Sequence, residues 1–302
     1  MLAVSIFIYM LSIVTSPEVP VQGAKEAVDT CLKTIVPSLF PVFVLNNILI
    51  KSGTVTCFCN RYLKWFSYIF KLPPASAAAI ILGIVSGYPV GIKVAGDLYE
   101  NRDINLNQYK HLSAFCANAG PAFITGAVGI GMFHSARIGL LLLTIHIISS
   151  FVVGILFCLL PKSSVTQTKT QPVLKRQPIS SVFTDSVESS IKTVAYICGY
   201  IIFFGTLTAY LQNILRYLPE IASSVITGFI EMTNGVITTS SSALPLNTKL
   251  TAVSGIIGWG GICVHAQSLS FLKYKKSYFL GKAMQGVISS AITYIILSII
   301  PS

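Results

Sequence analysis

A run of polar and helix-breaking residues interrupts the apolar segment that begins at Ala75: Ser86, Gly87, Tyr88, Pro89, Gly91 and Lys93. Pro89 lacks a backbone N–H and its ring clashes with the preceding turn, so a helix ends here. A second helix starting after the break would direct free N–H groups and a positive dipole end at a ligand. With the ammonium group of Lys93 nearby, the break favours an anion. The alternative is a kinked span whose Lys93 reaches the membrane interface.

An acidic residue occupies a comparable position in the second half of the chain. Glu231, followed closely by Thr233 and Asn234, falls inside the apolar segment 221–246. A charge at the centre of a membrane helix costs about 3 kcal/mol, so ionisable residues there are functional by default. Three roles are open for Glu231: pairing with Lys93, binding a coupling cation, or carrying a proton. The alternative is a carboxylate near the membrane interface.

The segments that follow the two breaks also combine polar side chains with small residues: Asn118, Gly120 and Pro121 in the first half, and Trp259, His265 and Gln267 in the second. Trp259 offers a surface on which a flat ring can stack, and His265 and Gln267 offer hydrogen bonds. We expect these residues to line a cavity. The alternatives are a core histidine with satisfied hydrogen bonds and an interfacial anchor at Trp259.

The composition indicates a membrane protein. Of 302 residues, 53% are hydrophobic and 10% charged, against about 25% charged in soluble domains. The net charge of +11 comes from lysines and arginines in short loops, which is typical of membrane topology and not of nucleic-acid binding. The histidines and cysteines show no metal-ligand spacing, and no nucleotide-binding or catalytic motif is present. We therefore expect no cofactor and no enzyme activity.

A polar linker divides the chain into two halves that resemble each other. The expected parts are an N-terminal span in 1–20, a first gate-like repeat in 21–160, a flexible cytoplasmic linker in 161–181 and a second gate-like repeat in 182–302. Val28–Leu45 aligns with Val187–Phe204, and later features follow in the same order in both halves. This common order favours a duplication.

The distribution of basic residues favours two re-entrant segments. If every apolar segment crossed the membrane, lysine and arginine would be spread over both sides, contrary to the positive-inside rule. If 75–96 and 221–246 dip in and return, most basic residues, including those of 273–282, fall on the linker side. The remaining crossings are then 34–50, 112–133, 138–160, 191–213, 250–272 and 278–300. With three crossings per half, the predicted fold is an all-α polytopic membrane protein of two inverted repeats, each with a broken, re-entrant segment.

Several stretches resemble the YlbJ-type sporulation integral membrane proteins, which belong to the nucleoside-recognition (Gate) domain family. They are Ser86–Lys93, Asn118–Gly129, Gly258–Gly261 with Val264–Gln267, and the proline-rich Val36–Pro41. The resemblance covers nearly the whole chain. It implies a multi-pass membrane protein with gate-like repeats, similar in plan to concentrative nucleoside transporters. The sporulation members of this family are implicated in moving dipicolinic acid, a flat aromatic dianion, into the developing spore.

We therefore expect a secondary-type transporter of a small organic anion, with dipicolinic acid as the first candidate cargo. Its expected location is a bacterial cell membrane or a membrane surrounding the spore. The alternatives are a nucleoside or nucleobase transporter and a non-transporting membrane scaffold of spore formation. The expected partners are a small-molecule substrate and the lipid bilayer, without nucleic acid, and self-association into a homo-oligomer is left open.

Overall fold

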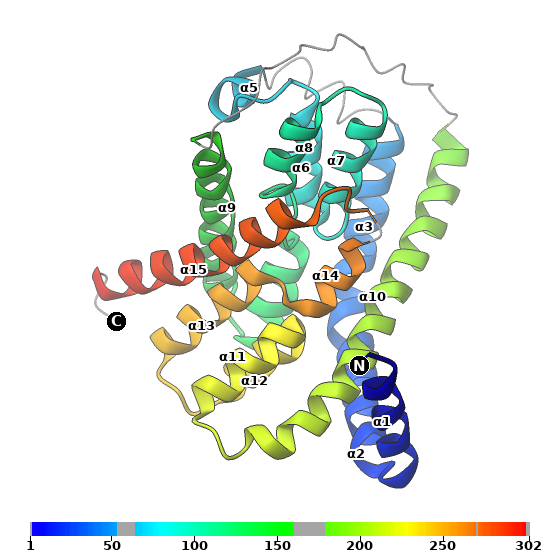
Figure 1. Cartoon of the computed structure of the whole chain (residues 1–302), viewed down its shortest axis with the longest axis vertical. Coiled ribbons are helices and arrows are strands. Elements are labelled where there is room, and N and C mark those ends of the chain that lie inside the picture. The colour runs from blue at the N-terminus through cyan, green and yellow to red at the C-terminus, as the bar shows by residue number, and fades with distance from the viewer. Residues whose placement is uncertain (1, 53–63, 160–178, 270, 300–302) are drawn as a thin grey trace.

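The described part of the chain is helical throughout. The computed structural model describes residues 2–52, 64–159, 179–269 and 271–299 (Figure 1). None of these residues forms a strand, so the predicted all-α class is confirmed. The expected linker lies outside the described residues except for its last three, which belong to helix α10, Ile179–Leu215.

Four helices of the described part are long and apolar enough to cross a membrane, which confirms a multi-pass membrane protein. The first, Glu18–Leu49, combines α2 (Glu18–Thr30), a π-helical stretch (Cys31–Ile35) and most of α3 (Val36–Lys51). The others lie in α9 (Ala136–Cys158), α10 and α15 (Lys275–Ile299). Each exceeds the roughly 20 residues that a bilayer requires.

The continuous helix from Glu18 departs from the predicted segments. The apolar pattern predicted a crossing over 34–50 alone, and the expected boundary between 1–20 and 21–160 falls inside α2. Small residues explain the difference, because a Cβ atom on Gly23 would lie 2.6 Å from the Cβ atom of Ala209 in α10. Such close approach stabilises helix pairs in membranes without a long apolar run.

Helix α1, Leu2–Thr15, lies beside α2 and α10 (Figure 1). The hydroxyl groups of Tyr9 and Thr206 of α10 share a hydrogen bond. With 14 residues, α1 is about 21 Å long, which is shorter than the hydrocarbon core of about 30 Å. The expected N-terminal span in 1–20 stays a prediction.

Two pairs of short helices lie where the sequence predicted re-entrant segments. The first pair is α6 (Ser76–Ser86) and α7 (Val90–Glu100), and the second is α11 (Glu220–Ile230) and α12 (Met232–Ser241). Within each pair the helices lie side by side, the first pair in the upper part of Figure 1 and the second in the lower part. Each pair is therefore a helical hairpin. We call the bends between the helices tip 1 (Ser86–Pro89) and tip 2 (Ile230–Thr233).

Two segments predicted as continuous crossings are broken instead. In 112–133, helix α8 (Leu106–Ser113) ends early and a non-helical stretch, 114–120, precedes the π-helix η2 (Ala122–Met132). In 250–272, α13 (Leu246–Trp259) and α14 (Gly261–Leu269) are separated at Gly260, whose φ is 92°. Both breaks leave backbone groups without helical partners, so they must pack against protein at membrane depth.

The same order of elements recurs in the two halves. A long helix is followed by a hairpin, a broken helix and a second long helix, first from α3 to α9 and then from α10 to α15. Short helix α5 (Lys64–Phe70) has no counterpart among the described residues. The duplication and the inverted relation of the repeats stay predictions.

Candidate functional site

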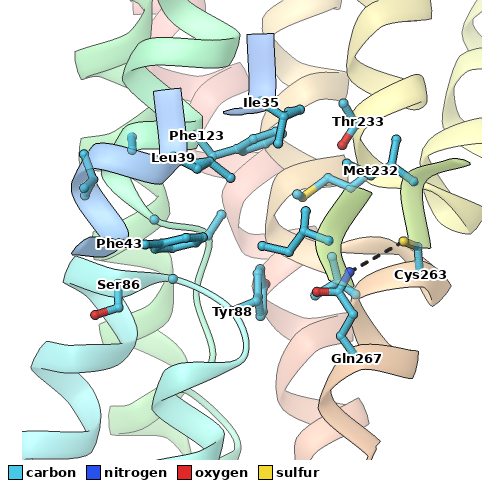
Figure 2. A pocket seen from close by; sticks show the side chains of 18 of the residues that line it. Ile35, Leu39, Phe43, Ser86, Tyr88, Phe123, Met232, Thr233, Cys263 and Gln267 are labelled. Carbon is cyan, nitrogen blue, oxygen red and sulfur yellow. Dashed lines mark hydrogen bonds between the residues drawn. The ribbon is translucent and has the colours of Figure 1, made fainter. Parts of the chain in front are cut away.

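The two hairpin tips meet at a small cavity of about 60 Å³ (Figure 2). The residues predicted from the sequence that line this cavity are Ser86, Gly87, Tyr88, Gly120, Glu231, Thr233 and Gln267. The rest of the wall is largely apolar and includes Phe43 and Phe123, from α3 and η2. Residues that are far apart in the sequence therefore come together at one place. A flat, partly apolar molecule suits such a wall, with polar groups limited to a few points.

Tip 1 depends on direct contact between backbones. Gly87 has a φ of 78°, which favours glycine, and a Cβ atom there would lie 2.8 Å from the amide nitrogen of Gly120. Further along the hairpin, Cβ atoms on Gly83 or Gly91 would each lie 1.9 Å from the carbonyl oxygen of Cys116. Gly91 therefore packs the hairpin against the non-helical stretch and does not line the cavity.

Tip 2 depends on a side chain. Glu231 has extended backbone geometry and is 1% exposed. Its carboxylate accepts hydrogen bonds from the backbone amides of Thr233, at 3.0 Å, and Asn234, at 2.6 Å. Glu231 is thus the N-cap of α12, where a negative charge also complements the helix dipole. Lys93 does not pair with it, so that suggested role is wrong, whereas cation binding and proton transfer stay predictions.

A larger cavity of about 670 Å³ adjoins the tip cavity, and Ile197 and Gln267 line both. We call this larger cavity the vestibule. Its wall includes the predicted residues Pro89 and Lys93, and Lys93 is exposed. The side chain of Gln267 therefore lies at the junction between the two spaces.

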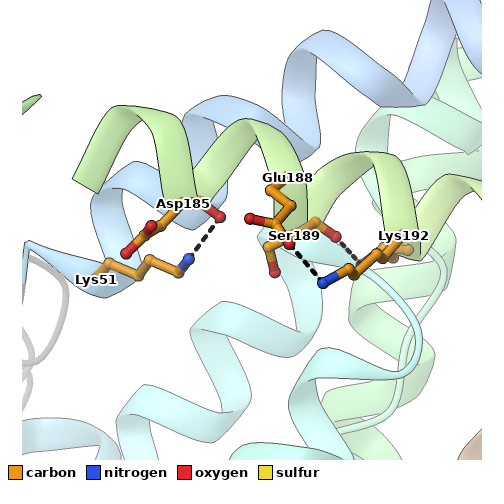
Figure 3. A network of polar contacts seen from close by, with 6 residues as sticks. Lys51, Asp185, Glu188, Ser189 and Lys192 are labelled. Atoms are coloured by element: carbon orange, nitrogen blue, oxygen red, sulfur yellow. Dashed lines mark hydrogen bonds and ion pairs between the residues drawn. The ribbon is translucent and has the colours of Figure 1, made fainter. Parts of the chain in front are cut away.

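The vestibule carries an excess of positive charge. Its charged lining residues are Lys51, Lys93, Lys192 and Asp97. Lys192 forms an exposed ion pair with Glu188 at 2.6 Å, and Lys51 donates a hydrogen bond to the carbonyl oxygen of Asp185 at 2.7 Å (Figure 3). This contact does not neutralise the charge of Lys51, because the partner atom is a carbonyl oxygen. A positively charged concave surface concentrates anions in the vestibule.

Six predicted site residues line neither cavity: Gly91, Asn118, Pro121, Asn234, Trp259 and His265. Trp259 stacks on Phe229, with ring centroids 4.9 Å apart, and donates a hydrogen bond to the carbonyl oxygen of that residue. His265 meets Trp259 edge to face and shares a hydrogen bond of 3.0 Å with the hydroxyl group of Tyr278. Both residues therefore support the broken helix behind tip 2. Pro121 precedes η2, and Asn118 belongs to the buried network described below.

Asn234 also points away from the tip cavity. Its amide donates a hydrogen bond to Thr208 of α10 at 3.2 Å, and it lines a separate cavity of about 100 Å³ between α2, α10 and α12. The backbone amide of Asn234 donates a hydrogen bond to the capping carboxylate of Glu231, while its side chain joins α12 to α10. Among the described residues, no group of three or more histidine, cysteine or acidic side chains could hold a metal ion.

Comparison with known proteins agrees with the resemblance found in the sequence. No family model and no solved structure matches the chain. The chain is 26% identical to the sporulation integral membrane protein YlbJ of Bacillus subtilis (strain 168), over 95% of this chain and 80% of the relative. The chain is therefore similar to a YlbJ-type protein over nearly its whole length. Because almost the entire chain is covered, the similarity includes both halves.

The sequence patterns did not reveal one ionisable residue near the site. Lys282 was counted among loop residues, but it lies inside α15 and is fully buried. Its ammonium group donates hydrogen bonds to the carbonyl oxygen of Ala117, at 3.1 Å, and to Oε1 of Gln285, at 2.8 Å. It also lies 4.9 Å from the centre of the Tyr88 ring, which is part of tip 1.

A polar network holds these groups in place. Gln285 donates hydrogen bonds to Oδ1 of Asn118, at 3.0 Å, and to the carbonyl oxygen of His146, at 3.3 Å, which orients its own oxygen toward Lys282. A signal for this network exists in the sequence, because buried polar residues recur at helical spacing along α15: Tyr278, Lys282, Gln285, Ser289 and Thr293.

Proposed function

We propose that this protein is a secondary-type membrane transporter of a small organic anion, and that it carries dipicolinic acid during sporulation. The role in sporulation is suggested by the similarity to YlbJ, a sporulation integral membrane protein. The sequence has no phosphate-binding loop, so we further propose that it is not an enzyme and that a gradient or simple facilitated diffusion drives movement of the cargo.

One observation carries this proposal: two helical hairpins meet tip to tip around a cavity that continues into a vestibule. Transporters commonly bind their cargo where interrupted helices meet near the centre of the membrane. Non-helical backbone is tolerated at that depth only next to protein or a watery cavity. In this arrangement, a small movement of one hairpin relative to the other changes access to the tip cavity.

The charges and the apolar wall support an aromatic anion as cargo. Lys51 and Lys93 attract anions into the vestibule. The aromatic rings of Phe43, Tyr88 and Phe123 then offer a wall for a flat ring in the tip cavity. The hydroxyl groups of Ser86 and Tyr88 are buried without a hydrogen-bond partner among the described residues, and buried polar groups of this kind call for a ligand or water.

A nucleoside is the second candidate, and Glu231 favours it. Among the described residues, this carboxylate lines the tip cavity and no lysine or arginine does. A carboxylate repels an anion at short range but accepts hydrogen bonds from the hydroxyl groups of a ribose. Neutral cargo would also gain little from the lysines of the vestibule, so the two candidates predict different effects of removing Lys93.

Uptake into liposomes tests the proposal. Purified protein is reconstituted alone, and entry of radiolabelled dipicolinate is compared with entry of uridine and adenosine. We expect dipicolinate uptake that saturates with concentration and is inhibited by unlabelled dipicolinate. Uptake of nucleosides alone would support the second candidate. Absence of all uptake by monodisperse, folded protein would contradict transport and favour a membrane scaffold.

A further inference from the structure

The surroundings of Lys282 are those of a bound cation. Its ammonium group is completely buried, and it contacts two neutral oxygen atoms and the face of an aromatic ring. Among the described residues, no carboxylate forms an ion pair with it; the ion pairs are Lys33–Asp29, Lys192–Glu188 and Lys273–Glu100. A buried charge without an ionic partner is expensive unless polar groups are arranged around it.

The broken helix supplies the first oxygen. In an intact helix the carbonyl group of Ala117 would bond to an amide four residues further on. The chain is non-helical from 114 to 120, so this oxygen is free to face α15. The contact between the two segments is direct, because a Cβ atom on Gly281 would lie 2.0 Å from the carbonyl oxygen of Ala114.

The second oxygen is fixed by a relay of hydrogen bonds. The amide nitrogen of Gln285 donates to Asn118 and to the backbone of His146, so its oxygen is held toward Lys282. The third partner, the ring of Tyr88, attracts a cation through its electron-rich face. The ammonium group therefore joins three separate parts of the site: tip 1, the non-helical stretch 114–120 and α15.

We propose that this arrangement is a binding site for a small monovalent cation, permanently filled by the ammonium group of Lys282. Carbonyl oxygen, amide oxygen and an aromatic face all favour a monovalent cation and none carries a full negative charge. A free cation would bind and leave as the hairpin moves. The side chain of Lys282 stays attached, so it keeps tip 1 docked without taking a metal cation from solution.

Chemical rescue tests this proposal independently of transport. Lys282→Ala removes the last three carbons and the nitrogen of the side chain, a fragment that n-propylammonium reproduces. The variant is purified in n-propylammonium chloride, in ammonium chloride, and in N-methyl-D-glucamine chloride at equal ionic strength, with 1-propanol as the neutral counterpart. The readouts are the yield of monodisperse protein and the apparent Tm. Lys276→Ala, at an exposed position of the same helix, is the control.

We expect n-propylammonium to raise the Tm of Lys282→Ala by about 3 °C or more and to restore its yield. Wild type and Lys276→Ala should not respond. Equal rescue by 1-propanol would show that only lost volume matters and would overturn the proposal. Failure of both ammonium and n-propylammonium to raise either yield or Tm would overturn it as well, even if the variant is poorly folded. These outcomes do not depend on whether the protein transports dipicolinate.

Discussion

The two hairpin tips have the same outline but are stabilised in opposite ways. Tip 1 bends through Gly87 and packs on Gly120, with the ammonium group of Lys282 behind Tyr88. Tip 2 bends at Glu231, whose carboxylate caps the helix that follows. Tip 1 thus relies on a position without a side chain and on a cation supplied by α15. Tip 2 relies on its own anionic side chain.

This difference gives the two tips different physical properties. Backbone packing at tip 1 leaves no room for adjustment, since protein interiors are as dense as crystals. The cap at tip 2 is a set of hydrogen bonds that a proton or a cation can weaken. We infer that tip 1 provides the fixed wall of the cavity and that tip 2 is the part that responds to charge. The following experiments test whether the two tips differ in this way.

The largest effect is expected from Gly87→Ala. The positive φ of Gly87 and the contact with Gly120 together should cost roughly 2–5 kcal/mol and lower both the yield and the apparent Tm in detergent. Gly199→Ala is the matched control, because a Cβ atom there has no neighbour within 4 Å and alanine favours a helix. If Gly87→Ala is as stable as the control, tip 1 is not a rigid wall.

The second effect concerns the cap of tip 2. Glu231→Ala leaves the amides of Thr233 and Asn234 without their acceptor, and we expect a loss of about 1–2 kcal/mol. Glu231→Gln retains one acceptor oxygen and should lose less. The control is Glu220→Ala, an exposed acid at the start of α11. Equal Tm values for Glu231→Ala and Glu220→Ala would show that the cap does not stabilise tip 2.

Gln285→Leu tests the support of tip 1 by the buried network. The change leaves the ammonium group of Lys282 with only the oxygen of Ala117 and the ring of Tyr88, and it should cost about 1–3 kcal/mol. Thermal unfolding of this variant is compared with that of Gln212→Leu, at an exposed position of α10. A Gln285→Leu protein as stable as wild type would mean that the network does not hold the cation.

The smallest effect on stability is expected for Lys93→Met, within about 0.5 kcal/mol, because the residue is exposed. Uptake should nevertheless change. We expect dipicolinate entry at low concentration to fall several-fold and its dependence on salt to weaken, while nucleoside entry is unchanged. Lys275→Met, an exposed lysine outside the vestibule, should behave like wild type. Unaltered anion uptake in Lys93→Met would remove the vestibule from the proposed pathway.

Sequence alone predicted both hairpin breaks because their causes are local. Pro89 cannot continue a helix whatever surrounds it, and Glu231 is an isolated acid in an apolar segment. The meeting of the tips could be expected only through the resemblance between the halves. The contact of Gly87 with Gly120 and the cap formed by Glu231 required the structure.

Other features depend on tertiary contacts that no local pattern reveals. Helix α2 is not apolar enough to be recognised from the sequence as part of a membrane crossing. It extends the first crossing because Gly23 lets it approach α10 closely. Lys282 follows a loop rich in lysine, so it was counted with the basic loop residues from which the membrane topology was predicted. Its burial depends on the carbonyl group of Ala117, which is available only because another segment is non-helical.

The central claim is that cargo reaches the cavity between the tips through the vestibule. Cys263 lines the tip cavity and is 1% exposed, so its rate of alkylation by a small thiol reagent, measured by mass spectrometry of the purified protein, reports directly on that space. We predict slow but measurable labelling that dipicolinate reduces at least several-fold, with no change at the half-buried Cys198, outside the cavity. Labelling of Cys263 that is unaffected by saturating dipicolinate and nucleosides would contradict the claim.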